Sequence, residues 1–209
     1  MSVGGQERLN PASDHRSDFI RRLFAIAVSV GFAGALANAA WVEAGRLPAA
    51  DELPRLACLI AGMILVIGSW ESYHRHIEKT DRSILVFYLD VVIVFSYLLM
   101  LLLSLSPNVF LWLVGIIFGL YVVWDILVLV RFGETVSHRR ALISALWCAC
   151  FLLLSFLNAT VARPEYWAAF SVLLAAICFR WRWFRTVPRT GFAVIVAWLP
   201  HVSPLIAGS

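Results

Sequence analysis

Apolar stretches of about twenty residues recur along the chain and limit its fold more than any other feature. A helix needs about 20 apolar residues to cross the hydrocarbon core of a bilayer. Six stretches meet or approach that length, and polar, proline-containing or charged segments separate them. They cover residues 19–41, 56–70, 83–105, 109–130, 141–161 and 166–179. We therefore predict an all-α, polytopic membrane protein with six transmembrane helices.

The composition favours the same fold class. Hydrophobic residues make up 61% of the 209 residues, and charged residues make up only 14%. A soluble domain would carry about 25% charged residues. The composition therefore excludes a soluble enzyme, a disulfide scaffold and a disordered chain. The four cysteines lie in apolar stretches without a C-x-x-C pair, which is typical of buried free thiols. They are Cys58, Cys148, Cys150 and Cys178.

The basic residues are distributed unevenly between alternate segments outside the predicted spans. Of the 17 lysines and arginines, 14 lie before or at the very start of the first span, or after the second, fourth and sixth spans. Because cytoplasmic loops carry an excess of basic residues, we predict a cytoplasmic N-terminus in a bacterial inner membrane. Residues 1–17 then form a short polar cytoplasmic tail, and 18–185 form the transmembrane bundle. The apolar segment 186–209 is interfacial, re-entrant or a seventh span.

Three acidic residues lie in or beside the predicted spans. A charge at the bilayer centre costs at least about 2.5 kcal/mol, so each of them needs a physical reason. Asp90 and Asp125 both lie about 10 Å inside the predicted cytoplasmic boundary, at 1.5 Å per residue. The short hairpin at Pro107 makes their two helices antiparallel neighbours, so we expect the two carboxylates at similar depth. Glu71 ends the second span near the same interface.

These acids permit two interpretations. In the first, Asp90, Asp125 and Glu71 line the pathway of a small cation or proton through an oligomeric channel or transporter. In the second, the acids form structural ion pairs, and Arg21 and Arg22 at the start of the first span are candidate partners. The protein would then be a non-transporting interaction or effector subunit in the membrane.

Small residues mark two predicted packing faces. Gly31 and Gly34 lie in the first span, and Gly115 and Gly119 form a G-x-x-x-G pattern in the fourth. Small residues let helix backbones approach closely. A six-span chain also has little room for a pore of its own. We therefore expect a homo-oligomer in the lipid bilayer.

The sequence carries no motif for catalysis or metal binding. It has no G-x-S-x-G elbow, no H-E-x-x-H pair and no P-loop, so we predict no enzyme. A lipid-modifying enzyme at the cytoplasmic interface is the weakest alternative. His74, His76 and His138 lie at the predicted cytoplasmic rim, where solvated side chains are the simplest interpretation. We expect no metal, no cofactor and no nucleic-acid partner.

Two stretches in the first half of the chain carry a family-like pattern. Residues 19–26 read Phe-Ile-Arg-Arg-Leu-Phe-Ala-Ile, beside a first-helix signature F-S-D-x-V-F-A-I. Trp70 and His74 match a W-x-x-H-H-R-like second-helix end. In both stretches the chain resembles the lysosomal potassium channel family and its bacterial six-span relatives, although Ile20 and Arg21 replace the signature Ser-Asp pair. The resemblance implies a cation-channel fold without the family's potassium selectivity.

Overall fold

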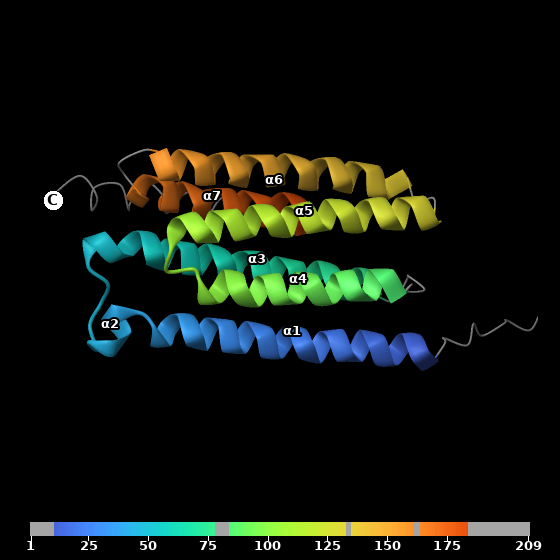
Figure 1. The fold of residues 1–209 in the computed structure, drawn as a ribbon, viewed down its shortest axis with the longest axis horizontal. Coiled ribbons are helices and arrows are strands. Elements are labelled where there is room, and N and C mark those ends of the chain that lie inside the picture. The colour runs from blue at the N-terminus through green and yellow to red at the C-terminus, as the bar shows by residue number, and fades with distance from the viewer. Residues whose placement is uncertain (1–10, 78–83, 133–134, 161–163, 184–209) are drawn as a thin grey trace, which may run out of the picture.

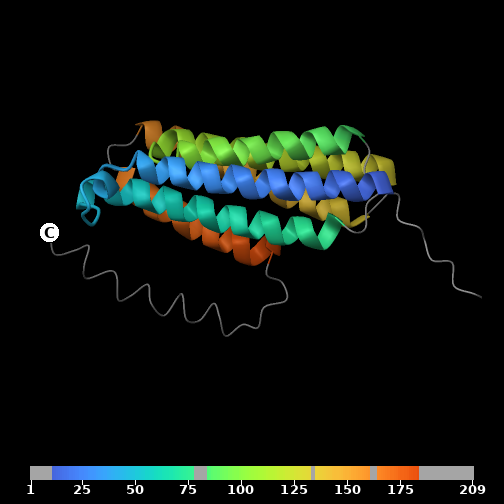
Figure 2. The same ribbon diagram turned by 90° about the horizontal axis from the view of Figure 1, so that it is seen from below.

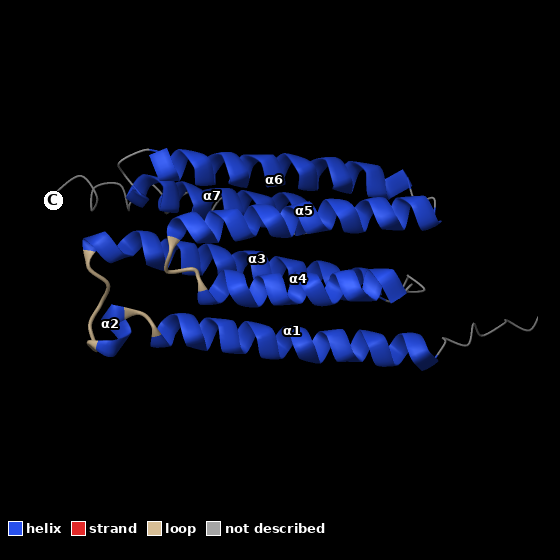
Figure 3. Ribbon diagram, viewed as in Figure 1, coloured by secondary structure: helices blue, strands red, loops and turns tan. Residues whose placement is uncertain are grey.

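The computed structural model describes residues 11–77, 84–132, 135–160 and 164–183 (Figure 1). Every regular element within these ranges is a helix (Figure 3), which confirms the predicted all-helical fold for this part of the chain. A short helix, α2, and a single 3-10 turn, η1, connect α1 to α3. The elements are α1 (Pro11–Ala37), α2 (Ala40–Glu43), η1 (Ala50–Glu52), α3 (Leu53–Ile77), α4 (Ile84–Leu102), α5 (Pro107–Phe132), α6 (Thr135–Thr160) and α7 (Pro164–Trp183).

The long helices lie side by side along one axis, as both views show (Figures 1 and 2). We call the end where α1 and α4 begin the N-terminal end, and the end with α2 and η1 the loop end. Helix α1 packs on α4, α4 on α5, α5 on α6, and α3 on α7. Helix α7 starts at the loop end and stops short of the N-terminal end in both views.

Five helices are long and apolar enough to cross a membrane, namely α1, α3, α4, α5 and α6. Helix α7 is excluded from this set because its apolar part covers only Trp167–Ile177. Glu165 precedes that part and Arg180 follows it. The sixth span therefore stays a prediction, and the segment 186–209 lies outside the described residues.

Helix α1 differs from its predicted range at both ends. It begins at Pro11, inside the predicted polar tail, because a proline at the first helical position loses no intrahelical hydrogen bond. It ends at Ala37, because the side chain of Asn38 donates to the carbonyl of Gly34 at 2.7 Å. The backbone N–H of Ala39 then turns back to Leu36 at 3.0 Å, which closes the helix with a tight last turn.

Helices α4 and α5 form the antiparallel hairpin that their short connection predicts (Figure 1). The turn covers residues 103–106, and Pro107 is the first residue of α5 rather than part of the turn. The carbonyl of Ser106 accepts a hydrogen bond from the N–H of Phe110 at 2.9 Å, which starts the new helix. The hairpin fixes how residues on α4 face residues on α5.

Large apolar side chains cover the outside of the bundle. Ile26 is 61% exposed, Leu142 71% and Val130 79%. Soluble proteins rarely expose apolar surface on this scale, since it would drive aggregation in water. This surface is compatible with the predicted multi-pass membrane protein, whose partner is the lipid bilayer.

The four predicted packing glycines lie at helix contacts within the chain. A Cβ atom placed on Gly31 would lie 2.9 Å from a side-chain carbon of Leu101. The same atom on Gly115 would lie 2.7 Å from Leu152. Gly31 and Gly34 face Leu101 and Leu102 on α4, while Gly115 and Gly119 face Leu152 and Cys148 on α6. These faces are used inside one chain, and the homo-oligomer stays a prediction.

Candidate functional site

Asp90 lies in the interior of the bundle. It follows the first residue of α4 by six positions, which places it about 9 Å from the N-terminal end. Only 5% of its surface is exposed. The indole N–H of Trp124 on α5 donates to Oδ1 of Asp90 at 3.1 Å. A buried carboxylate is stabilised by such a donor, because it has lost the water that would otherwise solvate it.

Asp125 lies at a similar depth on the neighbouring helix. It is fully buried and precedes the end of α5 by seven residues, about 10 Å of helix. Its Oδ1 lies 3.3 Å from Nε of Arg140 on α6, and the hydroxyl of Ser144 donates to Oδ2 at 3.4 Å. The N–H of Arg140 Nε is not directed at Oδ1, so the attraction between them is ionic. The short α5–α6 connection brings these groups together.

Trp124 connects the two acidic residues. Its N–H binds Asp90, and its ring face lies 5.7 Å from the guanidinium carbon of Arg140. Arginine stacks favourably on a tryptophan face because the ring carries negative charge density there. We call Asp90, Trp124, Asp125, Arg140 and Ser144 the acidic cluster. It links α4, α5 and α6 at one level of the bundle.

The arginine beside Asp125 is Arg140, which the sequence did not single out. Arg22 pairs with Asp18 one turn earlier on α1, at 2.8 Å, and both side chains are exposed. Among the described residues, Arg21 forms no ion pair with an acid, although its Nε is buried. Arg140 pairs with Asp125 instead. Glu71, the third predicted acid, lies on α3, and its side chain is outside the described residues.

Three hydroxyl groups meet deeper in the bundle. Ser69 on α3 and Tyr97 on α4 are both buried, and their oxygens share a short hydrogen bond. Tyr121 on α5 approaches Ser69 at 2.8 Å and Tyr97 at 3.2 Å. Tyrosine side chains lean toward the N-terminus of their helix, so the tyrosines of two antiparallel helices lean toward one another. We call Ser69, Tyr97 and Tyr121 the hydroxyl cluster.

Apolar side chains close the bundle on the loop side of the hydroxyl cluster. A Cβ atom on Gly62 would lie 3.1 Å from Leu101, 3.4 Å from Met100 and 3.4 Å from Phe110. Met100, Leu101 and Phe110 are each fully buried. Gly62 precedes Ser69 by seven residues, so it lies on the same face of α3, two turns nearer the loop end. We call these four residues the apolar plug.

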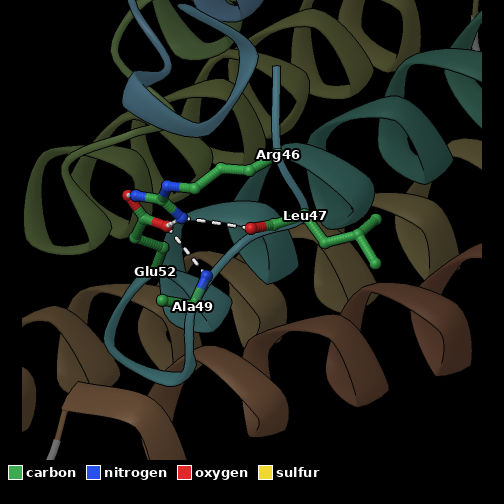
Figure 4. Close-up of polar contacts among 4 residues, drawn as sticks. All are labelled: Arg46, Leu47, Ala49 and Glu52. Carbon is green, nitrogen blue, oxygen red and sulfur yellow. Dashed lines mark hydrogen bonds and ion pairs between the residues drawn. The ribbon is translucent and has the colours of Figure 1, made fainter. Parts of the chain in front are cut away.

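A separate ion pair holds the connection between α1 and α3 at the loop end (Figure 4). Arg46 donates from both terminal nitrogens to the carboxylate of Glu52, at 2.6 and 2.9 Å. The N–H of Ala49 donates to the same carboxylate at 2.8 Å. The hydrogen bond to Glu52 raises the pKa of Arg46 above its ordinary value. Leu47 points away from this pair and is 87% exposed.

Sequence reasoning missed the partners of the acids and the whole hydroxyl cluster. Trp124 and Ser144 lie in apolar stretches that look like ordinary membrane helix. Tyr97 and Tyr121 offered a usable signal, because tyrosines in spans concentrate at the membrane interface and these two lie further inside. Arg140 also offered one, since a short loop separates its helix from that of Asp125.

Comparisons with known proteins add no information about the function of this site. A scan of protein-family models, a search of curated proteins and a search of solved structures each found no match to this chain. The resemblance to the lysosomal potassium channel family therefore stays a prediction. Among the described residues, no three histidine, cysteine, aspartate or glutamate side chains gather as metal ligands would.

Proposed function

We propose that this protein moves a small cation or proton across a membrane, with Asp90 and Asp125 as polar waypoints and Glu71 at the mouth. The observation that carries the proposal is the burial of two carboxylates at one level between membrane-length helices. Asp90 is 5% exposed and Asp125 is fully buried. Ionisable residues within membrane spans are rare, and they commonly mark substrate or ion pathways and proton relays.

A contribution to folding stability does not by itself explain why charged residues occupy the acidic cluster. Replacing a buried ion pair by apolar side chains of similar volume is commonly neutral or stabilising by about 1–4 kcal/mol. Asp125 and Arg140 lie in a bundle with an extensive apolar core. Apolar residues there would hold α5 and α6 together at a lower desolvation cost. The retained charges therefore favour a role in transport.

The proposed topology has six spans, with α7 as the sixth and the N-terminus in the cytoplasm. The acidic cluster then lies in the cytoplasmic half of the membrane, and the apolar plug lies in the outer half. Hydrophobic constrictions block ions because a narrow apolar passage holds no water. In this proposal the buried plug is a closed barrier, and it must separate before anything passes.

The test is flux into liposomes that carry the purified protein. The wild type is compared with the double variant Asp90→Asn with Asp125→Asn, under imposed proton, sodium and potassium gradients and under voltage. Asp18→Asn is the matched control, because Asp18 is an exposed acid on α1 that pairs only at the surface. We expect flux in the wild type and the control, and its loss in the double variant at unchanged oligomer size. Absence of wild-type flux under every gradient would overturn the proposal.

A non-transporting interaction or effector subunit is the second candidate. The Asp125–Arg140 pair favours it, because a neutralised acid is no longer a free binding site for a cation. This candidate predicts no wild-type flux and a lower unfolding temperature for Asp125→Asn. Neutralising the basic residues Arg139, Arg182 and Arg185, which leaves the Asp125–Arg140 pair intact, would then remove a bound partner.

A further inference from the structure

We infer that the hydroxyl cluster is a proton relay that extends the pathway from Asp90 to the apolar plug, so that the transported species is the proton. This inference rests on the proposed function and names its substrate. Three observations carry it: the mutual contact of Ser69, Tyr97 and Tyr121, the burial of Ser69 and Tyr97 beside a half-buried Tyr121, and their position between Asp90 and the plug.

The hydroxyl cluster lies in line with the acidic cluster on two helices. Tyr97 follows Asp90 by seven residues on α4, so the two share a face and lie about 10 Å apart along the axis. The ring of Tyr97 leans back toward Asp90. On α5, Tyr121 is one turn from Trp124, whose N–H binds Asp90. We assign the step between Asp90 and the hydroxyls to one bridging water molecule.

The same geometry disfavours a metal cation. The oxygen of Tyr121 lies 2.8 Å from that of Ser69 and 3.2 Å from that of Tyr97. Oxygens that hydrogen-bond one another leave no room for an ion among them, whereas a bound cation needs several oxygens arranged around it. Asp90 also faces the N–H of Trp124, and Asp125 faces the positive Arg140. A proton needs no cavity and travels along existing hydrogen bonds.

The proposed transfer balances at every oxygen. A proton that arrives from the N-terminal end converts the Asp90 carboxylate to its acid. The acid then gives its proton to the bridging water, which releases one of its own protons to the first hydroxyl. Each hydroxyl gains one O–H bond and breaks one, so no charge stays on it. When the plug opens, a water molecule that enters there accepts the proton from the last hydroxyl and becomes hydronium, and rotation of the three hydroxyls and of the bridging water restores the starting arrangement.

The experiment compares proton and metal-ion flux in the same liposomes, with a pH-sensitive dye and with sodium- and potassium-sensitive dyes. The variants are Tyr97→Phe and Tyr121→Phe, which keep the rings and remove the hydroxyls. Tyr88→Phe is the control, because Tyr88 lies on α4 but is 60% exposed on the outer surface. We expect proton flux to fall about 100-fold in the first two variants and to stay unchanged in the third. Ser69→Thr, which keeps a hydroxyl, should conduct better than Ser69→Ala.

Each outcome bears on one proposal or on both. Sodium or potassium flux without proton flux would overturn the relay and leave the proposed transport function standing. Proton flux that survives both phenylalanine variants would also overturn the relay. Absence of all flux would overturn the proposed function itself. If a phenylalanine variant fails to fold, faster proton flux in Ser69→Thr than in Ser69→Ala supports the relay, and equal flux in these two variants overturns it.

Discussion

Trp124 can serve both acids because it presents a different surface to each. Its edge donates an N–H to Asp90, while its face lies against the guanidinium of Arg140. Arg140 in turn balances the charge of Asp125, so the negative charge on α5 depends on a residue from α6. One aromatic side chain thus couples two carboxylates that do not need to touch.

Breaking the ion pair from its positive side should destabilise the bundle. Arg140→Ala leaves the fully buried Asp125 without its cation, and we expect the free energy of unfolding to fall by about 3 kcal/mol. The double variant Asp125→Leu with Arg140→Met should recover most of that loss, because it removes both charges. Thermal unfolding in detergent measures both effects. A single variant as stable as the wild type would show that the pair contributes nothing.

The Arg46–Glu52 pair should protect the loop between α1 and α3. Arg46→Lys keeps the charge but loses the two parallel hydrogen bonds to Glu52, since an ammonium group cannot form them. We expect proteases to cut the 44–52 segment several-fold faster in this variant. Arg55→Lys is the control, because Arg55 is exposed in the first turns of α3. Equal cleavage of the two variants would rule out a protective role.

At the scale of helices, two glycines four residues apart have different tolerance for a side chain. A Cβ atom on Gly115 would lie 2.7 Å from Leu152, whereas one on Gly119 would lie 3.6 Å from the sulfur of Cys148. We expect Gly115→Ala to lower the free energy of unfolding by about 2 kcal/mol, because α5 and α6 would have to separate. Gly119→Ala should change it by about 0.5 kcal/mol or less, since alanine fits and favours the helix.

Detergent unfolding curves of the two glycine variants check this contrast. Adding Leu152→Ala to Gly115→Ala should restore part of the loss, because the shorter side chain leaves room for the new methyl group. If the free energy of unfolding does not recover in the double variant, the steric strain lies at a contact other than that between residues 115 and 152.

The sequence predicted the helices better than the contacts between them. Apolar length predicted six spans, and five of the described helices are long and apolar enough to cross a membrane. The short connection before Pro107 correctly made α4 and α5 antiparallel neighbours. The antiparallel pairing also predicted that Asp90 and Asp125 lie at a similar depth in the bundle. The depth of a residue follows from the number of residues between it and the end of its helix.

Which side chains become partners depends on how each helix is rotated about its own axis and packed against its neighbours. The spacing of residues along a single sequence does not give that rotation. Arg21 and Arg22 looked suitable by depth, yet Arg22 turns to Asp18 on its own helix. The hydroxyl cluster needs three helices to meet, and no local pattern reveals such a meeting. The end of α1 at Ala37 depended on one hydrogen bond from Asn38.

At the scale of the whole molecule, polar groups divide the bundle along its axis. The acidic cluster lies toward the N-terminal end, and the hydroxyl cluster lies nearer the middle of the bundle. The next layer toward the loop end is the apolar plug, with Met100, Leu101 and Phe110 fully buried. The proposed relay would therefore take up protons from the N-terminal end, and the direction of insertion decides which side of the membrane that is.

Cysteine labelling can determine the direction of insertion. In a chain whose four native cysteines are replaced by alanine, we expect Asp51→Cys to react with a membrane-impermeant maleimide in intact cells. His15→Cys should react only after the cells are permeabilised, because the basic segments favour a cytoplasmic N-terminal end. Both positions are exposed in the structure, so reactivity reports the side of the membrane rather than burial.

Trp183→Cys extends this test to α7. Labelling of this variant only after permeabilisation, as for His15→Cys, would mean that the chain crosses the membrane an even number of times before residue 183, with α7 as the sixth span. Labelling in intact cells would mean that α7 stays on the outer side.

The reverse pattern at Asp51 and His15 would place the acidic cluster in the outer half of the membrane. The relay would then load protons from outside, and the plug would be the barrier on the cytoplasmic side.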